Sequence, residues 1–209
     1  MDITIVFLLG LIISLIGVIP PGLLNMSAAK ISLKEGAMHG IMFSVGVCVI
    51  VCAQTFIAAI FSRYLSNHPD VIDILKRVAF VIFVLITIYF LVLARKQPKT
   101  SMPSPSKSKQ NRFFHGMFLS SLNVFPIPYQ SYMTLTISSF GWMTFDRVGI
   151  GSYVAGSASG TFIMLYIYIF FFDKIKDKAF TTQKNMNFII GTITGLVALF
   201  TLINIIREL

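Results

Sequence analysis

Six long stretches without a charged residue constrain this chain more than any other feature. They cover residues 3–29, 36–62, 78–94, 113–145, 148–172 and 185–206. A helix needs about 20 apolar residues to cross the hydrocarbon core of a bilayer, so each stretch is a candidate span, the third once its polar ends are included. All eight acidic residues lie outside them, and charged residues make up 12% of the chain against roughly 25% in soluble domains. We therefore predict an all-α, polytopic membrane protein with six transmembrane helices.

The basic residues predict which loops face the cytoplasm. Of the 17 Lys and Arg residues, 12 lie in the first, third and fifth loops, and 5 lie in the other loops and the C-terminal tail. Because basic loops tend to stay in the cytoplasm, both termini are predicted to lie outside the cell (cytoplasmic) membrane. Topology and anionic lipid head groups then explain the positive charge, and no nucleic-acid partner is expected.

The longest connection, residues 95–112, is predicted to be a flexible cytoplasmic linker. It contains three prolines, four serines and six basic residues without an acid. Such a composition cannot bury enough apolar surface to order itself. The linker would join two three-helix repeats, residues 1–94 and 113–209.

Four of the eight prolines fall inside two spans only, Pro20 and Pro21 in the first and Pro126 and Pro128 in the fourth. Pro21 and Pro126 are 105 residues apart, about half of the 209-residue chain. Two related units with an odd number of spans must have opposite orientations in the membrane. The spacing therefore predicts a 3+3 inverted repeat with broken first and fourth helices, an architecture of many secondary transporters.

The paired breaks also indicate where a substrate would bind. Proline removes a helical hydrogen bond and leaves carbonyls that must find internal partners or line a wet cavity, typically near the membrane midplane. Alternatively, the prolines only kink the helices, Asn side chains bind the freed carbonyls, and Gln54 makes a helix-to-helix hydrogen bond. The predicted substrate-binding residues are Pro20, Pro21, Gly22, Asn25, Gln54, Asn123, Pro126, Pro128, Tyr129 and Gln130.

Short motifs in both halves resemble those of a known family. Residues 17–22 read Gly-Val-Ile-Pro-Pro-Gly, followed by Asn25 and by Lys-Glu-Gly at 34–36, and residues 122–126 read Leu-Asn-Val-Phe-Pro. They are similar to the first and fourth spans of the lysine exporter family of amino-acid efflux proteins. The resemblance implies gradient-driven export of amino acids or similar small polar metabolites from the cytoplasm, coupled to an ion or proton. Where the family usually has Pro-Gly-Pro, this chain has Pro-Pro-Gly-Leu from residue 20.

Other polar residues leave the coupling open. Since no Asp or Glu lies inside a span, coupling would need backbone carbonyls, hydroxyls, or His39 and His115, although both histidines are predicted to be solvated residues near span ends. A substrate carboxylate can be held by the N–H groups at the start of a half-helix. Cys48 and Cys52 share a helix face and are interpreted as small apolar side chains, without a metal site.

Two further points concern function class and partners. No nucleotide-binding loop, Ser-His-Asp set or carboxylate pair occurs, so neither an enzyme nor a cofactor is expected. A small-ion channel or heavy-metal cation exporter remains an alternative. Glycines three to four residues apart in the fifth and sixth spans, including Gly156, Gly160, Gly191 and Gly195, suggest packing faces and make a homodimer worth testing.

Overall fold

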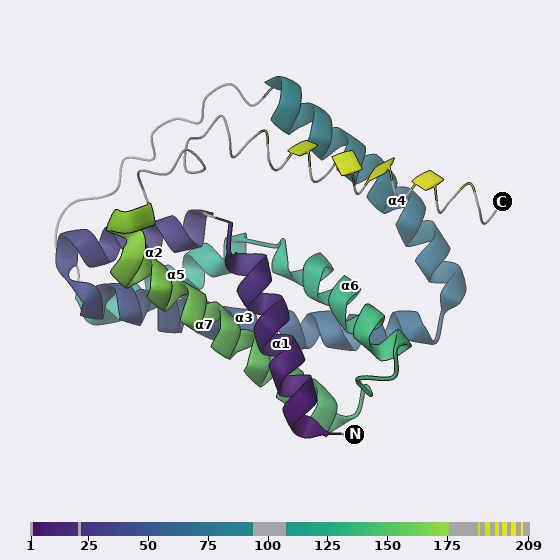
Figure 1. Ribbon diagram of the computed structural model, residues 1–209, viewed down its shortest axis with the longest axis horizontal. Coiled ribbons are helices and arrows are strands. Elements are labelled where there is room, and N and C mark those ends of the chain that lie inside the picture. Colours follow the sequence, from purple (N-terminus) through teal and green to yellow (C-terminus); the bar gives the residue numbers. More distant parts are fainter. Residues whose placement is uncertain are drawn as a thin grey trace. The chain divides into compact units, whose positions relative to one another are not determined.

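The computed structural model describes residues 2–20, 22–93 and 108–175, and the individual positions 188, 191–192, 195–196, 198–199, 202–203 and 206. These residues are all helical apart from short connections, which confirms the all-α prediction (Figure 1). The helices are α1 (Ile3–Val18), α2 (Leu23–Glu35), α3 (Ala37–Ser66), α4 (Pro69–Ile88), the π-helix η1 (Tyr89–Leu93), α5 (Lys109–Leu122), α6 (Pro126–Ser139) and α7 (Arg147–Ile175).

Two helices of this described set are by themselves long and apolar enough to cross a membrane. They are α3 over its whole length and α7 over Arg147–Phe171. The pair α1 and α2 meets the same criteria together and is bent by 79° where the first span was predicted to break. Pro21 itself lies outside the described residues, as does most of the predicted sixth span.

The predicted fourth span contains two helices, α5 and α6, separated by Asn123, Val124 and Phe125. Helix α5 begins at Lys109, inside the segment 95–112 that was predicted to be a linker, and the Ser108 side chain accepts a hydrogen bond from the Asn111 N–H as its N-cap. The rest of that segment, residues 95–107, lies outside the described residues.

The chain forms two compact units, residues 1–66 with 105–174 and residues 67–104 with 175–209. The first unit contains α1, α2, α3, α5, α6 and α7, and holds every predicted site residue that the structure describes. The second contains α4 and η1. In the second unit Gly191 lies against the Leu91 side chain.

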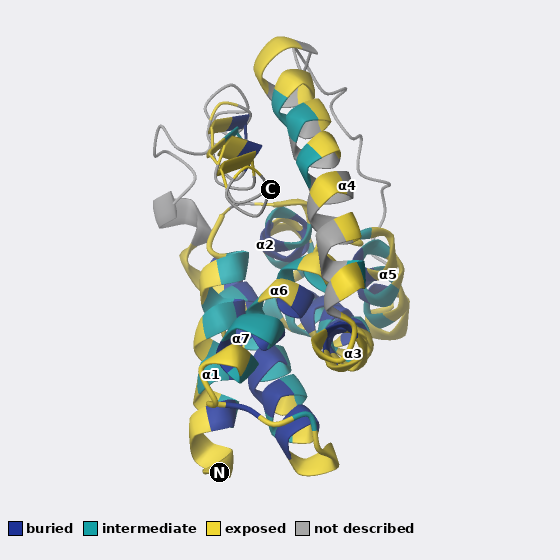
Figure 2. Cartoon of the chain, turned by 90° about the vertical axis from the view of Figure 1, so that its right-hand side faces the viewer, coloured by how far each residue is buried: buried dark blue, intermediate teal, exposed yellow. Residues whose placement is uncertain are grey.

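The helices of the first unit are sorted so that large apolar residues face outward. On α1, Leu8, Ile12 and Ile16 are 47–57% exposed, whereas Gly10 and Ser14 on the opposite face are buried (Figure 2). On α3 the exposed large hydrophobic residues between positions 56 and 64 are Phe56, Ile57, Ile60, Phe61 and Tyr64. Aqueous surfaces rarely carry so large an apolar patch, but hydrocarbon requires one. The chain is a multi-pass membrane protein.

Glycines set the closest helix contacts. At the crossing of α3 and α5, a Cβ on Gly46 would collide with the Phe113 carbonyl oxygen, and one on Gly116 with that of Phe43. At the crossing of α1 and α7 (Figure 1), a Cβ on Gly10 or Gly156 would likewise meet a backbone carbonyl of the other helix. Small residues allow this approach, which supplies the van der Waals contact that holds helices together in lipid.

The two crossings use corresponding positions of the sequence. The corresponding residues lie 106 positions apart between α1 and α5, and 110 positions apart between α3 and α7. The pairs are Phe7 with Phe113, Gly10 with Gly116, Leu11 with Met117, Phe43 with Tyr153, Gly46 with Gly156 and Val47 with Ser157.

Candidate functional site

Five buried polar side chains from four helices meet inside the first unit. We call them the central polar cluster: Ser14 of α1, Thr55 of α3, Gln130 of α6, and Tyr153 and Ser157 of α7. Each is 3% exposed or less. The cluster joins elements from both halves of the chain, so no single helix hairpin can assemble it.

The hydrogen bonds of the cluster converge on Gln130. Its Nε2 donates to Ser14 Oγ at 2.8 Å and to Ser157 Oγ at 3.1 Å, and its Oε1 accepts from the Tyr153 hydroxyl at 2.6 Å. Ser14 Oγ also donates to Ser157 Oγ at 2.6 Å, and Thr55 Oγ1 lies 3.1 Å from the same atom. Because unpaired polar groups are costly in an apolar interior, the cluster fixes the relative positions of the four helices.

At the first break, side chains bind the carbonyl oxygens of the last residue of α1 and of the two residues after it. Asn25 Nδ2 donates to the carbonyl oxygens of Val18 at 2.7 Å and Pro20 at 3.0 Å, and the Tyr168 hydroxyl donates to that of Ile19 at 2.8 Å. Asn25 therefore has the role of the alternative interpretation, in which the amide satisfies carbonyls freed by the break. Gly22 follows the break as the residue before α2 and carries no side chain that can cap that helix.

At the second break the same task falls to a residue of another helix. Gln54 Nε2, from α3, donates to the carbonyl oxygens of Ser120 at 3.1 Å and Asn123 at 2.8 Å. The half-buried Asn123 thus takes part through its backbone carbonyl. Gln54 Oε1 is buried and has no partner, which leaves an amide oxygen desolvated at a cost of about 1–3 kcal/mol.

The prolines of the second break begin a helix instead of interrupting one. Pro126 is the first residue of α6 and Pro128 is the third. The first turn of a helix has no internal partners for its N–H groups, so proline loses little there and its fixed φ favours the helix. Pro128 is exposed, which separates its side chain from the buried cluster.

Helix α6 starts against the last turns of α1, which brings the two breaks together. The Tyr129 hydroxyl donates to the Ile13 carbonyl oxygen at 2.9 Å, and the Tyr129 ring covers Gly17, where an added Cβ would lie 2.7 Å from a ring carbon. Gly17 is three residues before Pro20, and Tyr129 is three residues after Pro126. Of the predicted site residues, Gln130 enters the central polar cluster, Tyr129 joins the breaks, and Asn25 and Gln54 each close one of them.

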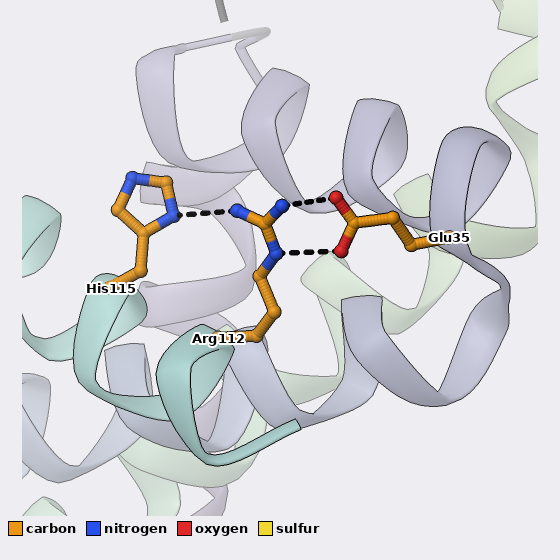
Figure 3. A network of polar contacts seen from close by, with 3 residues as sticks. All are labelled: Glu35, Arg112 and His115. Carbon is orange, nitrogen blue, oxygen red and sulfur yellow. Dashed lines mark hydrogen bonds and ion pairs between the residues drawn. The ribbon is translucent and has the colours of Figure 1, made fainter. Parts of the chain in front are cut away.

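An ion pair that no pattern in the sequence indicated joins α2 and α5 (Figure 3). The Arg112 guanidinium binds the Glu35 carboxylate through two nitrogens, with Nε to Oε2 at 2.7 Å and Nη2 to Oε1. Arg112 is 4% exposed, although the charge pattern placed it in a solvated linker. Its Nη1 also donates to Nδ1 of His115 at 3.5 Å, and the His115 ring contacts the Phe43 ring edge to face. His115 is half-buried, so the expectation of a solvated residue is not met in full.

A comparison with known families identifies the class of protein to which this chain belongs. The model of the LysE type translocator family matches residues 15–205 of the 209. The chain belongs to the LysE type translocator family. No curated protein and no solved structure matches it. The resemblance drawn from the two break motifs is thereby confirmed, and the chain is a membrane translocator, from a family of transporters and not of enzymes.

Cys48, Gly156 and Gly160 of this translocator make packing contacts between helices. Cys48 Sγ lies 3.7 Å from the Ala158 carbonyl oxygen, a weak contact, and within the described ranges no three His, Cys, Asp or Glu residues gather closely enough to hold a metal. Gly156 and Gly160 pack against the backbone of α1. These two glycines are therefore used inside the chain, and they give no support to a homodimer.

Proposed function

We propose that this translocator is a secondary active exporter of amino acids or similar small polar metabolites, driven by an ion or proton gradient. Its substrate site would lie between the broken first and fourth spans, near the midplane of the cytoplasmic membrane, with both termini outside. The observation that carries this proposal is the central polar cluster, a buried set of donors and acceptors supplied by both halves beside the two breaks.

The matched helix crossings support the inverted repeat on which the proposal relies. Each crossing joins the leading span of one half to the second span of the other half, and the contacting positions agree over both helices. Two polar contacts follow the same rule. Ser14 Oγ donates to Ser157 of α7, and the residue 106 positions later, Ser120, donates through Oγ to the Val47 carbonyl oxygen at 3.4 Å. Val47 and Ser157 are again 110 positions apart.

The chemistry of the site suits a small polar substrate. Ser, Thr, Tyr and Gln side chains both donate and accept, so they can exchange their mutual hydrogen bonds for bonds to a substrate. Helices α2 and α6 begin beside the breaks after Gly22 and Phe125, neither of which can cap a helix with its side chain. Their first N–H groups and positive dipole ends would bind a carboxylate.

The cluster is buried in this structure, so the proposed transport cycle must open it from each side in turn. Rocking of one repeat against the other is the general route by which inverted repeats expose a fixed midplane site. The contacts that would break are those between α1 of the first repeat and α6 and α7 of the second. They include the hydrogen bond from Tyr129 to the Ile13 carbonyl oxygen and the hydrogen bonds of Ser14 with Gln130 and Ser157.

Amino-acid release from cells tests the proposal. Cells expressing the protein would be loaded with a panel of dipeptides, and extracellular amino acids would be followed against cells expressing Gln130→Leu at equal membrane insertion. Ser121→Ala is the matched control, because its exposed hydroxyl binds only a carbonyl of its own helix, at 2.8 Å. We expect accelerated release of particular amino acids that Gln130→Leu abolishes and Ser121→Ala retains.

Absence of release across the whole panel would contradict the proposal. A conductance or a metal resistance conferred by the same cells would then identify the small-ion channel or the heavy-metal cation exporter instead. Undiminished release by Gln130→Leu would keep the exporter and remove the site.

A further inference from the structure

One buried polar atom has no partner, and it lies at the second break. Among the residues that the structure describes, Gln54 Oε1 is the single buried side-chain nitrogen or oxygen without a hydrogen bond. Gln54 is 6% exposed. The other buried glutamine, Gln130, has hydrogen-bond partners at both its Oε1 and its Nε2.

The orientation of the Gln54 amide is fixed by its neighbours. Its Nε2 donates to the carbonyl oxygens of Ser120 and Asn123, and carbonyl oxygens only accept, so a flipped amide would place oxygen against oxygen. The Oε1 without a partner is therefore the other polar atom of the amide whose nitrogen binds these two carbonyl oxygens at the C-terminal end of α5.

The surroundings of this atom attract positive charge. Ser120 and Asn123 lie at the C-terminal end of α5, where the helix dipole is negative. Gln54 Oε1 is thus a buried acceptor without a partner, on an amide whose nitrogen donates to two carbonyl oxygens at this end of α5. A buried acceptor without a partner needs an explanation. The simplest is that it accepts a hydrogen bond from a donor that the translocator binds during only part of its cycle.

We infer that Gln54 Oε1 accepts a hydrogen bond from the protonated amino group of the exported substrate. This inference rests on the proposed function and names the chemical group that the site selects. A divalent metal ion fits the position less well, since Ca²⁺ takes six to eight oxygen ligands and Mg²⁺ takes six. An ammonium group carries three N–H donors and needs only a few acceptors. Its positive charge is also favoured by the negative end of the α5 dipole.

Two substitutions separate this role from a structural one. Gln54→Lys keeps donors for the carbonyls of Ser120 and Asn123 but has no acceptor and adds positive charge. Gln54→Glu keeps an acceptor for an ammonium group and loses the amide donors. If Oε1 binds substrate, the Glu variant retains selection for amines and the Lys variant loses it; if Gln54 only caps the break, the order is reversed.

The experiment uses the full chain, purified and reconstituted in liposomes. Uptake of radiolabelled L-leucine and L-lysine is competed with their unlabelled forms and with 4-methylpentanoate and 6-aminohexanoate, the acids that lack the α-amino group of leucine and of lysine. We expect the wild type to prefer the amino acid to the matching acid at least tenfold, Gln54→Glu to keep the preference within about threefold, and Gln54→Lys to lose it. Ser62→Ala, which removes the buried hydrogen bonds of Ser62 with the Ser131 carbonyl oxygen and the Thr134 hydroxyl, controls for loss of packing.

Comparison of the two amino acids shows which of the substrate's amino groups binds Gln54 Oε1. A change confined to L-lysine would assign the contact to a side-chain amine, and equal changes for both amino acids to the α-amino group. Retained preference in Gln54→Lys with loss in Gln54→Glu, or a change in ion dependence alone, would overturn the inference and leave the exporter intact. Failure of the wild type to transport either amino acid, in vesicles where melting temperatures show a folded protein, would overturn the inference together with the proposed function.

Discussion

The Arg112 guanidinium and the Glu35 carboxylate, 77 residues apart, form a two-pronged ion pair that fastens the end of α2 to the start of α5 (Figure 3). At the position 106 residues before Arg112 stands Val6, which is buried in an apolar cluster with Ile137 and Tyr153. The two crossings that match in their glycines therefore differ at this point. One is completed by an ion pair and the other by apolar packing.

Removing one member of this pair should destabilise the protein strongly. Arg112→Ala leaves the Glu35 carboxylate, whose side chain is 11% exposed, without its cation. We expect a loss of about 3 kcal/mol in the free energy of unfolding, measured by thermal unfolding in detergent. The double variant Glu35→Met with Arg112→Met should be less destabilised than Arg112→Ala, because a buried pair can be replaced by apolar side chains. If the loss in the double variant equals the sum of the losses in Glu35→Met and Arg112→Met, the two residues do not interact.

Side chains added at the helix crossings should separate the helices. Gly46→Ala and Gly156→Ala each place a Cβ against a backbone carbonyl that cannot move away as a side chain can. We expect each to lower the free energy of unfolding by about 1–3 kcal/mol. Gly151→Ala is the matched control on α7, since its Cβ meets no atom within 4 Å, and it should stabilise the helix by about 0.5 kcal/mol. Equal effects at Gly151 and Gly156 would contradict the close crossing.

Within the central polar cluster, Tyr153→Phe is a narrow test. The substitution keeps the ring in the apolar core and removes only the hydroxyl that donates to Gln130 Oε1 at 2.6 Å. The orphaned amide oxygen should reduce the free energy of unfolding by about 1–2 kcal/mol. An unchanged melting temperature would mean that water or another group replaces the hydroxyl.

Acid should weaken the start of α7 through Asp146. The hydrogen bond from the Thr144 hydroxyl, at 2.7 Å, and that from the Gly149 N–H lower the pKa of the Asp146 carboxyl below its ordinary value. A carboxyl whose pKa is lowered by folding stabilises the protein above its unfolded pKa, and this contribution is lost as the pH falls through the folded pKa. Between pH 7 and 3 the melting temperature of the wild type should therefore fall further than that of Asp146→Asn. Parallel curves would show that the Asp146 carboxylate does not contribute to stability.

How far the sequence predicts this molecule depends on the kind of contact. Charge spacing and prolines are local signals. They predicted the all-α class, which is confirmed, and interruptions near Pro20 and Pro126, where the structure has a bend between α1 and α2 and a separation of α5 from α6. They also placed Asn25, Tyr129 and Gln130 beside the breaks. The Arg112–Glu35 pair depends on how α2 and α5 cross, which no local pattern records.

The serines of the central polar cluster escaped prediction for a related reason. Hydroxyl side chains in helices often bind the carbonyl four residues earlier, as Ser44 does with Gly40 and Ser159 with Ala155. Nothing local separates them from Ser14, which donates across to another helix. The usable signal is Gly10, one turn before Ser14, which marks the face of α1 that packs closely.

Efflux from liposomes under an imposed gradient tests the central claim most directly. Reconstituted wild type would be loaded with radiolabelled amino acids, and their release measured with and without a proton or sodium gradient, beside Gln130→Leu and protein-free liposomes. The account predicts saturable, gradient-dependent release of particular amino acids by the wild type and none above background by Gln130→Leu. Release equal to that from protein-free liposomes under every gradient, from protein that melts cooperatively, would contradict it.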